Sequence, residues 1–513
     1  MKNESADFEK SREEDEVFFE DAFELAGHGR FNHLVLLTSG LILLNVSMES
    51  VGMSYVITAA ECDLHLSSEE KGLVSAAAFI GIISTSFVWG YLGDRLGRRR
   101  VMLPALLASA AFSIASSFSA SVWTLLVLRI LTGCLVSASS ATVYAYLGET
   151  HMSSRRASAI AWGSVFISFS FITLPGLAWS IIPGKWSFDL LGMAVVPWRA
   201  FMWTWCAPGI AAAVLLLLLP ESPRFLLATH GPDAALPVLA QMYAWNNRAT
   251  RFCFPVKKIM SGNLGADKVG GFAGAVKNMA LMFKPPLLRC VFISHVSMFA
   301  VFMISSGLYM WVPDILNNIL KNTSEDSLTI CTIIQEKILK QKNMTLLSPD
   351  HACTADVSVG VFPISMVMGA VFALTYLAIG VFINKIGKKT LYSSIMIVCG
   401  FMTVAAAFVP QGAAATALLI IALCSGCSAS ILAAVAVDVF PTCLRAMAMC
   451  VMYMVGRTGA AVGSYLIGAF LNTHCLASFN VLGLFTAGST VLMIFWPKPE
   501  RIREKMEQLG LTY

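Results

Sequence analysis

The chain has 513 residues, of which 57% are hydrophobic and 13% are charged, with a formal net charge of +5. Soluble domains carry roughly 25% charged residues, so this composition excludes a water-soluble protein, which could not bury so much apolar surface. The positive balance follows from the loops described below and gives no reason to expect a nucleic-acid partner.

Hydrophobic segments separated by polar breaks occur along nearly the whole chain. Several reach the roughly 20 apolar residues that a helix needs to cross a bilayer. We therefore expect an all-α membrane protein with about twelve transmembrane helices, arranged as two six-helix halves over residues 34–219 and 288–496. The helices are predicted to begin near Leu34, Lys71, Val101, Val122, Ala157, Arg199, Leu288, Val359, Leu391, Ala413, Ala446 and Cys475.

The segments outside the two halves indicate the orientation in the membrane. Residues 1–33 form an acidic tail without the basic start and short apolar core of a cleavable signal peptide. Most Lys and Arg residues lie on one side of the predicted helices, including the connection at 220–287 and the C-terminal tail at 497–513. Because cytoplasmic loops retain positive charge, both termini are predicted to be cytoplasmic.

The first predicted helix carries an acid near its middle. Asn45, Glu49 and Gly52 have i, i+4 and i+7 spacing, which places them on one helix face. An ionisable group costs roughly 3 kcal/mol at the centre of a membrane helix and therefore indicates function. We expect Glu49 to face a central cavity as a ligand for a proton or cation. The alternative is a glutamate hydrogen-bonded in a helix contact.

The loop after the second predicted helix reads GYLGDRLGRRR over residues 90–100. Gly90 and Gly97 allow close backbone approach, and Asp94 can accept hydrogen bonds from helix N-terminal amides across the interface between the halves. The basic run at 98–100 can pair with Glu149 or with anionic lipid. The alternative is that this run only follows the positive-inside bias.

Acid–base pairs recur where the predicted helices meet the cytoplasm. Rearranging such pairs can open and close the inner side of a transporter. A single exposed pair contributes only about 0 to 1 kcal/mol, so ordinary interfacial charges are the alternative. The predicted cytoplasmic gate consists of Gly90, Asp94, Arg95, Gly97, Arg98, Glu149, Arg156, Glu221, Arg224, Asp438 and Arg445.

Two arginines lie inside predicted helices. Arg129, in the fourth helix, can pair with Glu49, hold an anionic substrate or order the helix packing. Arg457, in the eleventh helix, has no acid in the middle of the second half to pair with. A substrate carboxylate or an acid of the first half is therefore its expected partner.

Aromatic residues near the predicted cavity are candidates for stacking on a sugar ring or an organic cation. Tyr55 lies in the first helix, and Tyr309 and Trp311 lie near the outer end of the seventh. The alternative is packing, or the aromatic belt found at membrane surfaces.

The loop at about 313–358 carries signs of an oxidising, glycosylating compartment. It holds two acceptor sequons, at Asn322 and Asn343, and two cysteines, Cys331 and Cys353. We expect glycans on both asparagines and a disulfide between the two cysteines. The remaining cysteines lack the spacing of a metal site, and no metal or cofactor is expected.

The chain repeats its loop signals once. Residues 380–389 read GVFINKIGKK and resemble residues 90–100, although Asn384 replaces Asp94. The Glu149 and Arg156 pair has a counterpart in Asp438 and Arg445 at nearly the same offset. Two halves of common descent are typical of transporters that bind solute between the halves near the membrane midplane.

These motifs carry a family resemblance. The 90–100 loop resembles the signature loop of the major facilitator superfamily, and Pro220-Glu221-Ser222-Pro223-Arg224 resembles a motif of its sugar and organic-ion branches. FELAGHGRF at 23–31, AWSIIP at 178–183 with WSF at 186–188, and WVPD at 311–314 are similar to the synaptic vesicle glycoprotein 2 family and its relatives. That family's large luminal domain is much longer than the loop after the seventh helix here.

Two functions follow as hypotheses. One is a transporter that moves a small organic solute, a sugar or an organic ion, by alternating access, with membrane lipid around it and a coupling proton or cation as a further partner. The other is a transport-weak vesicle protein that regulates secretion through vesicle-associated protein partners, as the resemblance implies. Val46, where the resembling family has a second acid, favours the latter. No enzyme motif is present, and the expected location is a vesicle or plasma membrane.

Overall fold

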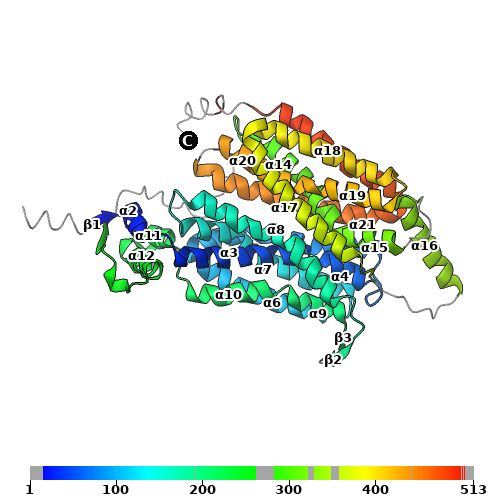
Figure 1. Cartoon of the computed structure of the whole chain (residues 1–513), viewed down its shortest axis with the longest axis horizontal. Coiled ribbons are helices and arrows are strands. Elements are labelled where there is room, and N and C mark those ends of the chain that lie inside the picture. Colours follow the sequence, from blue (N-terminus) through cyan, green and yellow to red (C-terminus); the bar gives the residue numbers. More distant parts are fainter. Residues whose placement is uncertain are drawn as a thin grey trace, which may run out of the picture.

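The computed structural model describes residues 16–190, 192–260, 282–321, 328–347, 357–440 and 442–497, together with 500 and 502. Within these ranges the fold is almost entirely helical (Figure 1). Eleven helices of the described part are long and apolar enough to cross a membrane. The structure therefore shows a multi-pass all-α architecture.

The N-terminal half forms one bundle of long helices (Figure 1). Apolar side chains lie on nearly all faces of these helices, as expected where lipid replaces water around the bundle. The elements are α3 (Arg30–Val51), α4 (Met53–Ala59), α5 (Ser68–Leu96), α6 (Arg98–Ser117), α7 (Val122–Glu149), α8 (Arg156–Ile181), α9 (Pro197–Thr204) and α10 (Ala207–Leu218). Between α8 and α9 lies an antiparallel hairpin of β2 (Phe188–Leu190) and β3 (Met193–Val195).

The C-terminal half forms a second bundle that lies against the first. Its elements are α14 (Leu288–Phe302), the π-helical turn η2 (Met303–Leu308), η3 (Tyr309–Trp311), α15 (Val312–Lys321), α17 (Val361–Ile386), α18 (Lys388–Phe408), α19 (Gly412–Leu423), η4 (Cys424–Cys427), α20 (Ser428–Val439) and α21 (Thr442–Ile494). Helix α16 (Ile330–Leu347) lies outside the bundle, between α15 and α17 in the chain.

The last candidate span, Met447–Ile494, covers 48 residues. A continuous helix of this length would extend about 72 Å, roughly twice the thickness of the hydrocarbon core. The backbone at His474 is not helical, with φ −137° and ψ 49°. The predicted start of the twelfth helix, Cys475, is the next residue. This break therefore lies between the two helices that the sequence predicts to begin near Ala446 and Cys475.

A small cap covers one end of the N-terminal half. It consists of β1 (Glu16–Phe18), α2 (Phe19–Leu25), α11 (Pro223–His230), α12 (Pro232–Asn247), η1 (Arg251–Cys253) and β4 (Lys258–Met260), with β1 and β4 paired in parallel. Asn246 joins the cap to the start of α3: its amide donates to the carbonyls of Ala26 and Gly27 and accepts from the backbone N–H of Phe31. We name this end of the molecule the α12 end, and the opposite end, with α16, β2 and β3, the α16 end (Figure 1).

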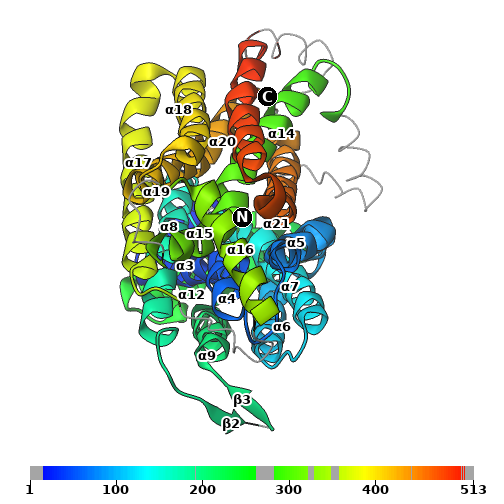
Figure 2. The same ribbon diagram turned by 90° about the vertical axis from the view of Figure 1, so that its right-hand side faces the viewer.

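The two halves meet through the helix pairs α5 with α21 and α8 with α17 (Figure 2). One buried hydrophobic cluster is shared by both halves and includes Tyr55, Trp311, Phe362 and residues of α16. Among the described residues, three further clusters each belong to a single half: one is centred on α14 and α20, one on α3 and the cap, and a small one lies between α6 and α7. The halves are therefore packed into one core at the α16 end and have separate cores elsewhere.

Candidate transport site

A buried ion pair joins α3 to α7. Nη1 of Arg129 lies 2.9 Å from Oε2 of Glu49, and the side chains are 0% and 2% exposed. The same carboxylate oxygen accepts from Ser113 Oγ at 3.0 Å, and Cys206 Sγ lies 3.6 Å from the other oxygen. The ring of Trp205 lies 5.3 Å from the guanidinium carbon and donates from Nε1 to Ser113. Both charges are thus compensated inside the N-terminal half.

The predicted face of α3 packs against the start of α10. A Cβ on Gly52 would meet the Trp205 ring at 2.5 Å, and a Cβ on Gly209 would meet the Asn45 amide at 2.6 Å. Asn45 is 3% exposed and Glu49 is 1% exposed. The shared face expected from the i, i+4, i+7 spacing is present, but in this conformation it lies in a helix contact. In this conformation Glu49 matches the alternative of a glutamate hydrogen-bonded in a helix contact, and a role as a proton or cation ligand stays a prediction.

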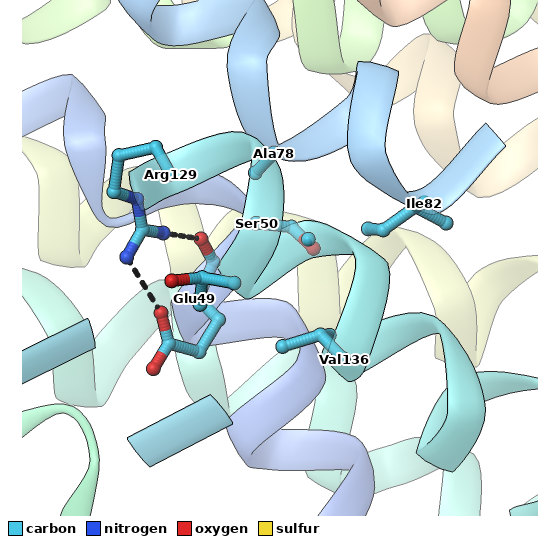
Figure 3. Close-up of a pocket in the computed structure, with 8 residues that line it drawn as sticks. Glu49, Ser50, Ala78, Ile82, Arg129 and Val136 are labelled. Atoms are coloured by element: carbon cyan, nitrogen blue, oxygen red, sulfur yellow. Dashed lines mark hydrogen bonds and ion pairs between the residues drawn. The ribbon is translucent and has the colours of Figure 1, made fainter. Parts of the chain in front are cut away.

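A narrow pocket, too small to hold a water molecule, lies beside this pair (Figure 3). Side chains of α3, α5 and α7 line it, including Ser50, Ala78, Ile82 and Val136. The two helices α5 and α7 cross closely there, because a Cβ on Gly133 would lie 2.3 Å from the carbonyl oxygen of Ala78. The pocket belongs to one half and is not the space between the halves.

Arg457 lies in α21 at the contact between the halves. Its Nη2 atom donates to Ser140 Oγ in α7, and its side chain is only partly buried. The phenol groups of Tyr144 and Tyr453 are its electrostatic neighbours. Among the side chains that the structure describes, no carboxylate lies within ion-pair distance of Arg457. Within the described part of the chain, Arg457 is therefore a cation between the halves that has no acidic partner.

The candidate aromatic residues lie in the shared core. Tyr55 stacks on Phe362 of the other half with ring centres 6.2 Å apart, and Tyr309 packs edge-on against Phe171 at 5.1 Å. Trp311 is fully buried and donates from Nε1 to the carbonyl of Ser464 at 2.9 Å. All three residues help to close the α16 end in this conformation.

The loop between α5 and α6 holds a charge network. Nη2 of Arg98 lies 2.9 Å from Asp94 and 3.0 Å from Glu149, and Nη1 donates to the Gly93 carbonyl. The Asp94 side chain is 60% exposed. Arg95 lies over the Tyr91 ring. The predicted pairing of the basic run with Glu149 is therefore present within the N-terminal half.

The amide-accepting role expected for Asp94 belongs to Glu221 in this structure. The Glu221 carboxylate accepts from the backbone N–H groups of Arg98, Arg99 and Arg100 at 3.1 to 3.3 Å. These are the free donors at the N-terminus of α6, where a negative charge is stabilising. Gly97 precedes them with φ +105°, and a Cβ there would lie 2.5 Å from Glu221.

The other predicted gate residues have different partners from those expected. Arg224 forms two hydrogen bonds to Glu20 at 2.6 and 2.9 Å, a contact with the acidic tail that the sequence spacing did not indicate. Arg156 donates to the Gly148 carbonyl at the end of α7. Nothing lies within 4 Å of a Cβ built on Gly90, so the close approach expected there is found instead at Gly93, against Thr142.

Several predicted residues are not described in full. Asp438 lies in α20 and Arg445 in α21, but their side chains are outside the described part. Asn343 lies in α16, again without a described side chain, and Asn322 and Cys353 lie outside the described residues.

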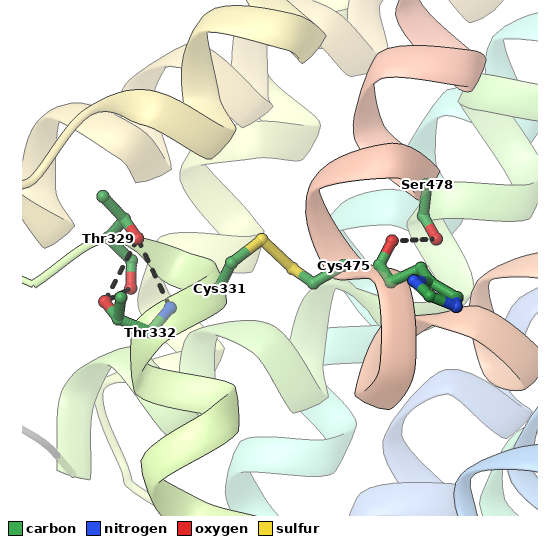
Figure 4. The surroundings of a disulfide bond; sticks show 6 residues. Thr329, Cys331, Thr332, Cys475 and Ser478 are labelled. Atoms are coloured by element: carbon green, nitrogen blue, oxygen red, sulfur yellow. Dashed lines mark hydrogen bonds between the residues drawn. A yellow bond between two sulfur atoms is a disulfide. The ribbon is translucent and has the colours of Figure 1, made fainter.

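The disulfide differs from the expected one. Cys331 of α16 is bonded to Cys475 of α21, with Cα atoms 5.6 Å apart (Figure 4). Cys62 is disulfide-bonded as well. The sequence paired the two cysteines of one loop, whereas α16 packs against α21 and Cys331 is bonded to Cys475. In the described part of the chain, no three His, Cys, Asp or Glu side chains are grouped to hold a metal ion.

One charged cluster at the α16 end was not predicted. Nζ of Lys71 lies 2.9 Å from Glu61 and 3.1 Å from Asp314, and the lysine side chain is 2% exposed. A lysine on the predicted outer side departs from the positive-inside bias. This departure is the one feature of the sequence that could have indicated the cluster.

Comparisons with known sequences agree with the motifs. Residues 35–335 and 344–509 match the Major Facilitator Superfamily model. Synaptic vesicle glycoprotein 2A of Rattus norvegicus is 34% identical over 243 residues, 47% of this chain and 33% of that protein. Synaptic vesicle glycoprotein 2B of Mus musculus is 32% identical over 245 residues, 47% of this chain and 36% of that protein. The chain thus spans about a third of the length of these curated relatives.

Solved structures share the fold. The inward open conformation of the xylose transporter XylE from E. coli has a TM-score of 0.65 and 15% identity, covering 93% of this chain and all of that one. An inward-facing bacterial homolog to human lysosomal transporter Spinster has a TM-score of 0.60 and 14% identity, covering 91% and 96%. Together with the family match over most of its length, the two-bundle architecture shows that this chain belongs to the Major Facilitator Superfamily.

Proposed function

We propose that this protein is a transporter that moves a small organic solute across a membrane by alternating access. The support is the asymmetry between the two ends of the molecule. The halves share one buried core at the α16 end and have separate cores elsewhere, which is the arrangement of a carrier closed on one side. The structural neighbours named as a xylose transporter and a D-xylose-proton symporter favour a solute of about the size of a sugar.

Arg457 is the observation that selects the solute class. It is a partly accessible cation between the halves, and the described side chains offer it no acid. A guanidinium binds carboxylate, sulfate or phosphate groups through two parallel hydrogen bonds. We therefore propose an organic anion as the solute, with Tyr144 and Tyr453 beside its charged group.

The proposed topology has twelve crossings, with the break at His474 dividing the last long helix into two. The α12 end is cytoplasmic, because the basic loop after α5 and the connection between the halves lie there, and the α16 end faces the lumen or the outside. Removal of glycans from intact vesicles or cells tests this orientation: wild type should lose mass, and Asn322→Gln with Asn343→Gln should not. An unglycosylated wild type would contradict the proposed orientation of the loop.

Coupling to a proton is proposed for the pair formed by Glu49 and Arg129. Protonation of the carboxylate would release the arginine, and the packing of α3 on α10 would have to change with it. The test is uptake into proteoliposomes with and without an inward proton gradient. The wild-type stimulation by the gradient should disappear in Glu49→Gln, whereas exchange of solute at equal pH should be less affected.

Uptake of a panel of organic anions, organic cations and sugars into proteoliposomes tests the solute class. Arg457→Gln should reduce uptake of the preferred anion about 10- to 100-fold, because a charge-assisted hydrogen bond contributes roughly 1.5–3 kcal/mol. Arg457→Lys should keep part of the activity. The matched control is Arg251→Gln, which removes an exposed cation of the cap. Preferred uptake of a neutral sugar, unaffected by Arg457→Gln, would contradict the anion proposal.

The proposed location is a vesicle or plasma membrane, with an orientation in which both termini are cytoplasmic. A regulatory role through vesicle proteins and an enzymatic role are not part of the proposal.

A further inference from the structure

Lys71 occupies an unfavourable position for a positive charge. It lies in the first turn of α5, where the helix dipole repels cations, and its side chain is 2% exposed. A buried ammonium group is costly unless it is paired. Two carboxylates compensate it, Glu61 at 2.9 Å and Asp314 at 3.1 Å.

The two carboxylates belong to different halves. Glu61 lies in the turn between α4 and α5, in the same half as Lys71, and Asp314 lies in α15 of the other half. If the halves separate at the α16 end, Asp314 moves away from Lys71 and Glu61 remains. The lysine thus has one partner that depends on closure and one that does not.

Helix α16 adds a second link between the two halves at the α16 end, and we call this contact between the halves the seam. Nζ of Lys337 lies 3.4 Å from Glu61, with its side chain 38% exposed, so this contact is individually weak. The disulfide between Cys331 and Cys475 fixes α16 to the C-terminal half (Figure 4). Glu61 is therefore held between a lysine of its own half and a lysine attached to the other half.

The backbones of α5 and α21 are in close contact next to Lys71. Gly72 faces Gly468, and a Cβ on Gly72 would lie 3.1 Å from the Gly468 Cα atom. Asn472 donates to Ser68 Oγ at 2.6 Å across the same contact. The ion pair between Lys71 and Asp314 therefore lies within a tight contact that must break for the α16 end to open.

We propose that Lys71 and Asp314 form the latch that holds the α16 end shut, and that Glu61 is the resident counter-ion that keeps Lys71 compensated while the latch is open. This proposal rests on the alternating access proposed above. It predicts that loss of Asp314 and loss of Glu61 have different consequences, although each carboxylate binds the same ammonium group.

The experiment measures how fast the α16 end opens. Phe362→Cys places a reporter cysteine at a fully buried position that stacks on Tyr55 across the halves. A membrane-impermeant maleimide is added to the side facing α16, and the labelling rate is corrected for the protein without the reporter. Asp314→Asn in this background should raise the rate about tenfold, which corresponds to a shift of 1.4 kcal/mol in the state ratio. Glu61→Gln, the matched control, removes only the weak contact with Lys337 between the halves and should leave the rate near that of the parent.

Two further variants separate a latch from a folding defect. Asp314→Glu keeps the charge and should restore slow labelling. Lys71→Met with Asp314→Asn leaves no unpaired buried charge from the latch and should label as fast as Asp314→Asn alone. Unchanged labelling in both Asp314→Asn and the double variant would overturn the latch, and so would an equal rise in Glu61→Gln. Because labelling needs no solute, a protein that labels as expected but carries none of the tested solutes would overturn the proposed function and leave the latch standing.

Discussion

The guanidinium group of Arg129 lies 2.9 Å from the carboxylate of Glu49, and helix packing excludes both side chains from solvent. Both residues belong to the N-terminal half, so the pair does not by itself connect the halves. Its hydrogen bonds to Ser113 and its contact with Trp205 tie four helical segments of that half together. In the proton coupling proposed above, protonation of Glu49 would therefore disturb contacts in all four of these segments.

Removing one member of this pair should be more harmful than removing both. Breaking a buried ion pair typically costs about 3–5 kcal/mol, because it leaves an uncompensated charge, whereas two apolar replacements avoid that penalty. Glu49→Gln and Arg129→Met should each lower the thermal unfolding temperature in detergent. The combined variant should unfold at a higher temperature than either. Additive losses would show that the two charges are compensated independently.

The disulfide between Cys331 and Cys475 should behave as one unit. Cys331→Ser, Cys475→Ser and the combined variant should lower stability equally, because each removes the same bond. The two cysteines are 144 positions apart, for which the chain-entropy model gives a constraint of about 5 kcal/mol. Peptide mapping without reductant should recover Cys331 joined to Cys475. A peptide joining Cys331 to Cys353 would contradict the structure.

Glu221 and Asp94 should differ in what they stabilise. Glu221→Gln weakens three backbone hydrogen bonds at the start of α6 and should cost about 1–2 kcal/mol of stability. Asp94→Asn changes a largely exposed side chain, so stability should stay near wild type while the balance between conformations shifts. Thermal unfolding and cysteine accessibility at both ends, measured on the same samples, distinguish the two effects. Equal destabilisation by both substitutions would contradict this assignment.

Three histidine rings meet beside the cap. His28 lies 5.4 Å from His33 and 5.7 Å from His151 between ring centres. Burial lowers the pKa of His151 to about 4, partly opposed by its hydrogen bond to the Leu147 carbonyl. Burial also lowers the pKa of His28, and Arg155 and His33 lower it further. Both rings are therefore neutral in the folded protein at neutral pH.

This neutrality predicts a pH dependence with a definite sign. The unfolded histidines titrate near 6.5, so their contribution to stability is present above that pH and is lost as the pH falls toward 4. Wild type should unfold at a lower temperature at pH 5 than at pH 7.5, and His151→Gln should reduce the difference. If His151→Gln kept the full difference in unfolding temperature between the two pH values, groups other than His151 would be responsible for it.

The sequence determined the membrane architecture because hydrophobic length is a local property. The first eleven predicted helix starts lie within a few residues of the first residues of the candidate membrane spans, of which the first begins at Arg30 and the last at Met447. The break at His474 adjoins the twelfth start, which was predicted at Cys475. The i, i+4, i+7 spacing likewise placed Asn45, Glu49 and Gly52 on one face. The pairing of Glu49 with Arg129 was one of several alternatives that the sequence left open.

Only the tertiary structure decided which groups meet across long separations. Glu221 binds the start of α6, Glu20 binds Arg224, and Asp314 binds Lys71, although each pair is more than a hundred positions apart in the chain. The same holds for Cys331, which pairs with Cys475 because α16 packs on α21. Spacing along one helix fixes which residues share a face, but the partner of that face depends on how separate helices pack, and no local pattern encodes that contact.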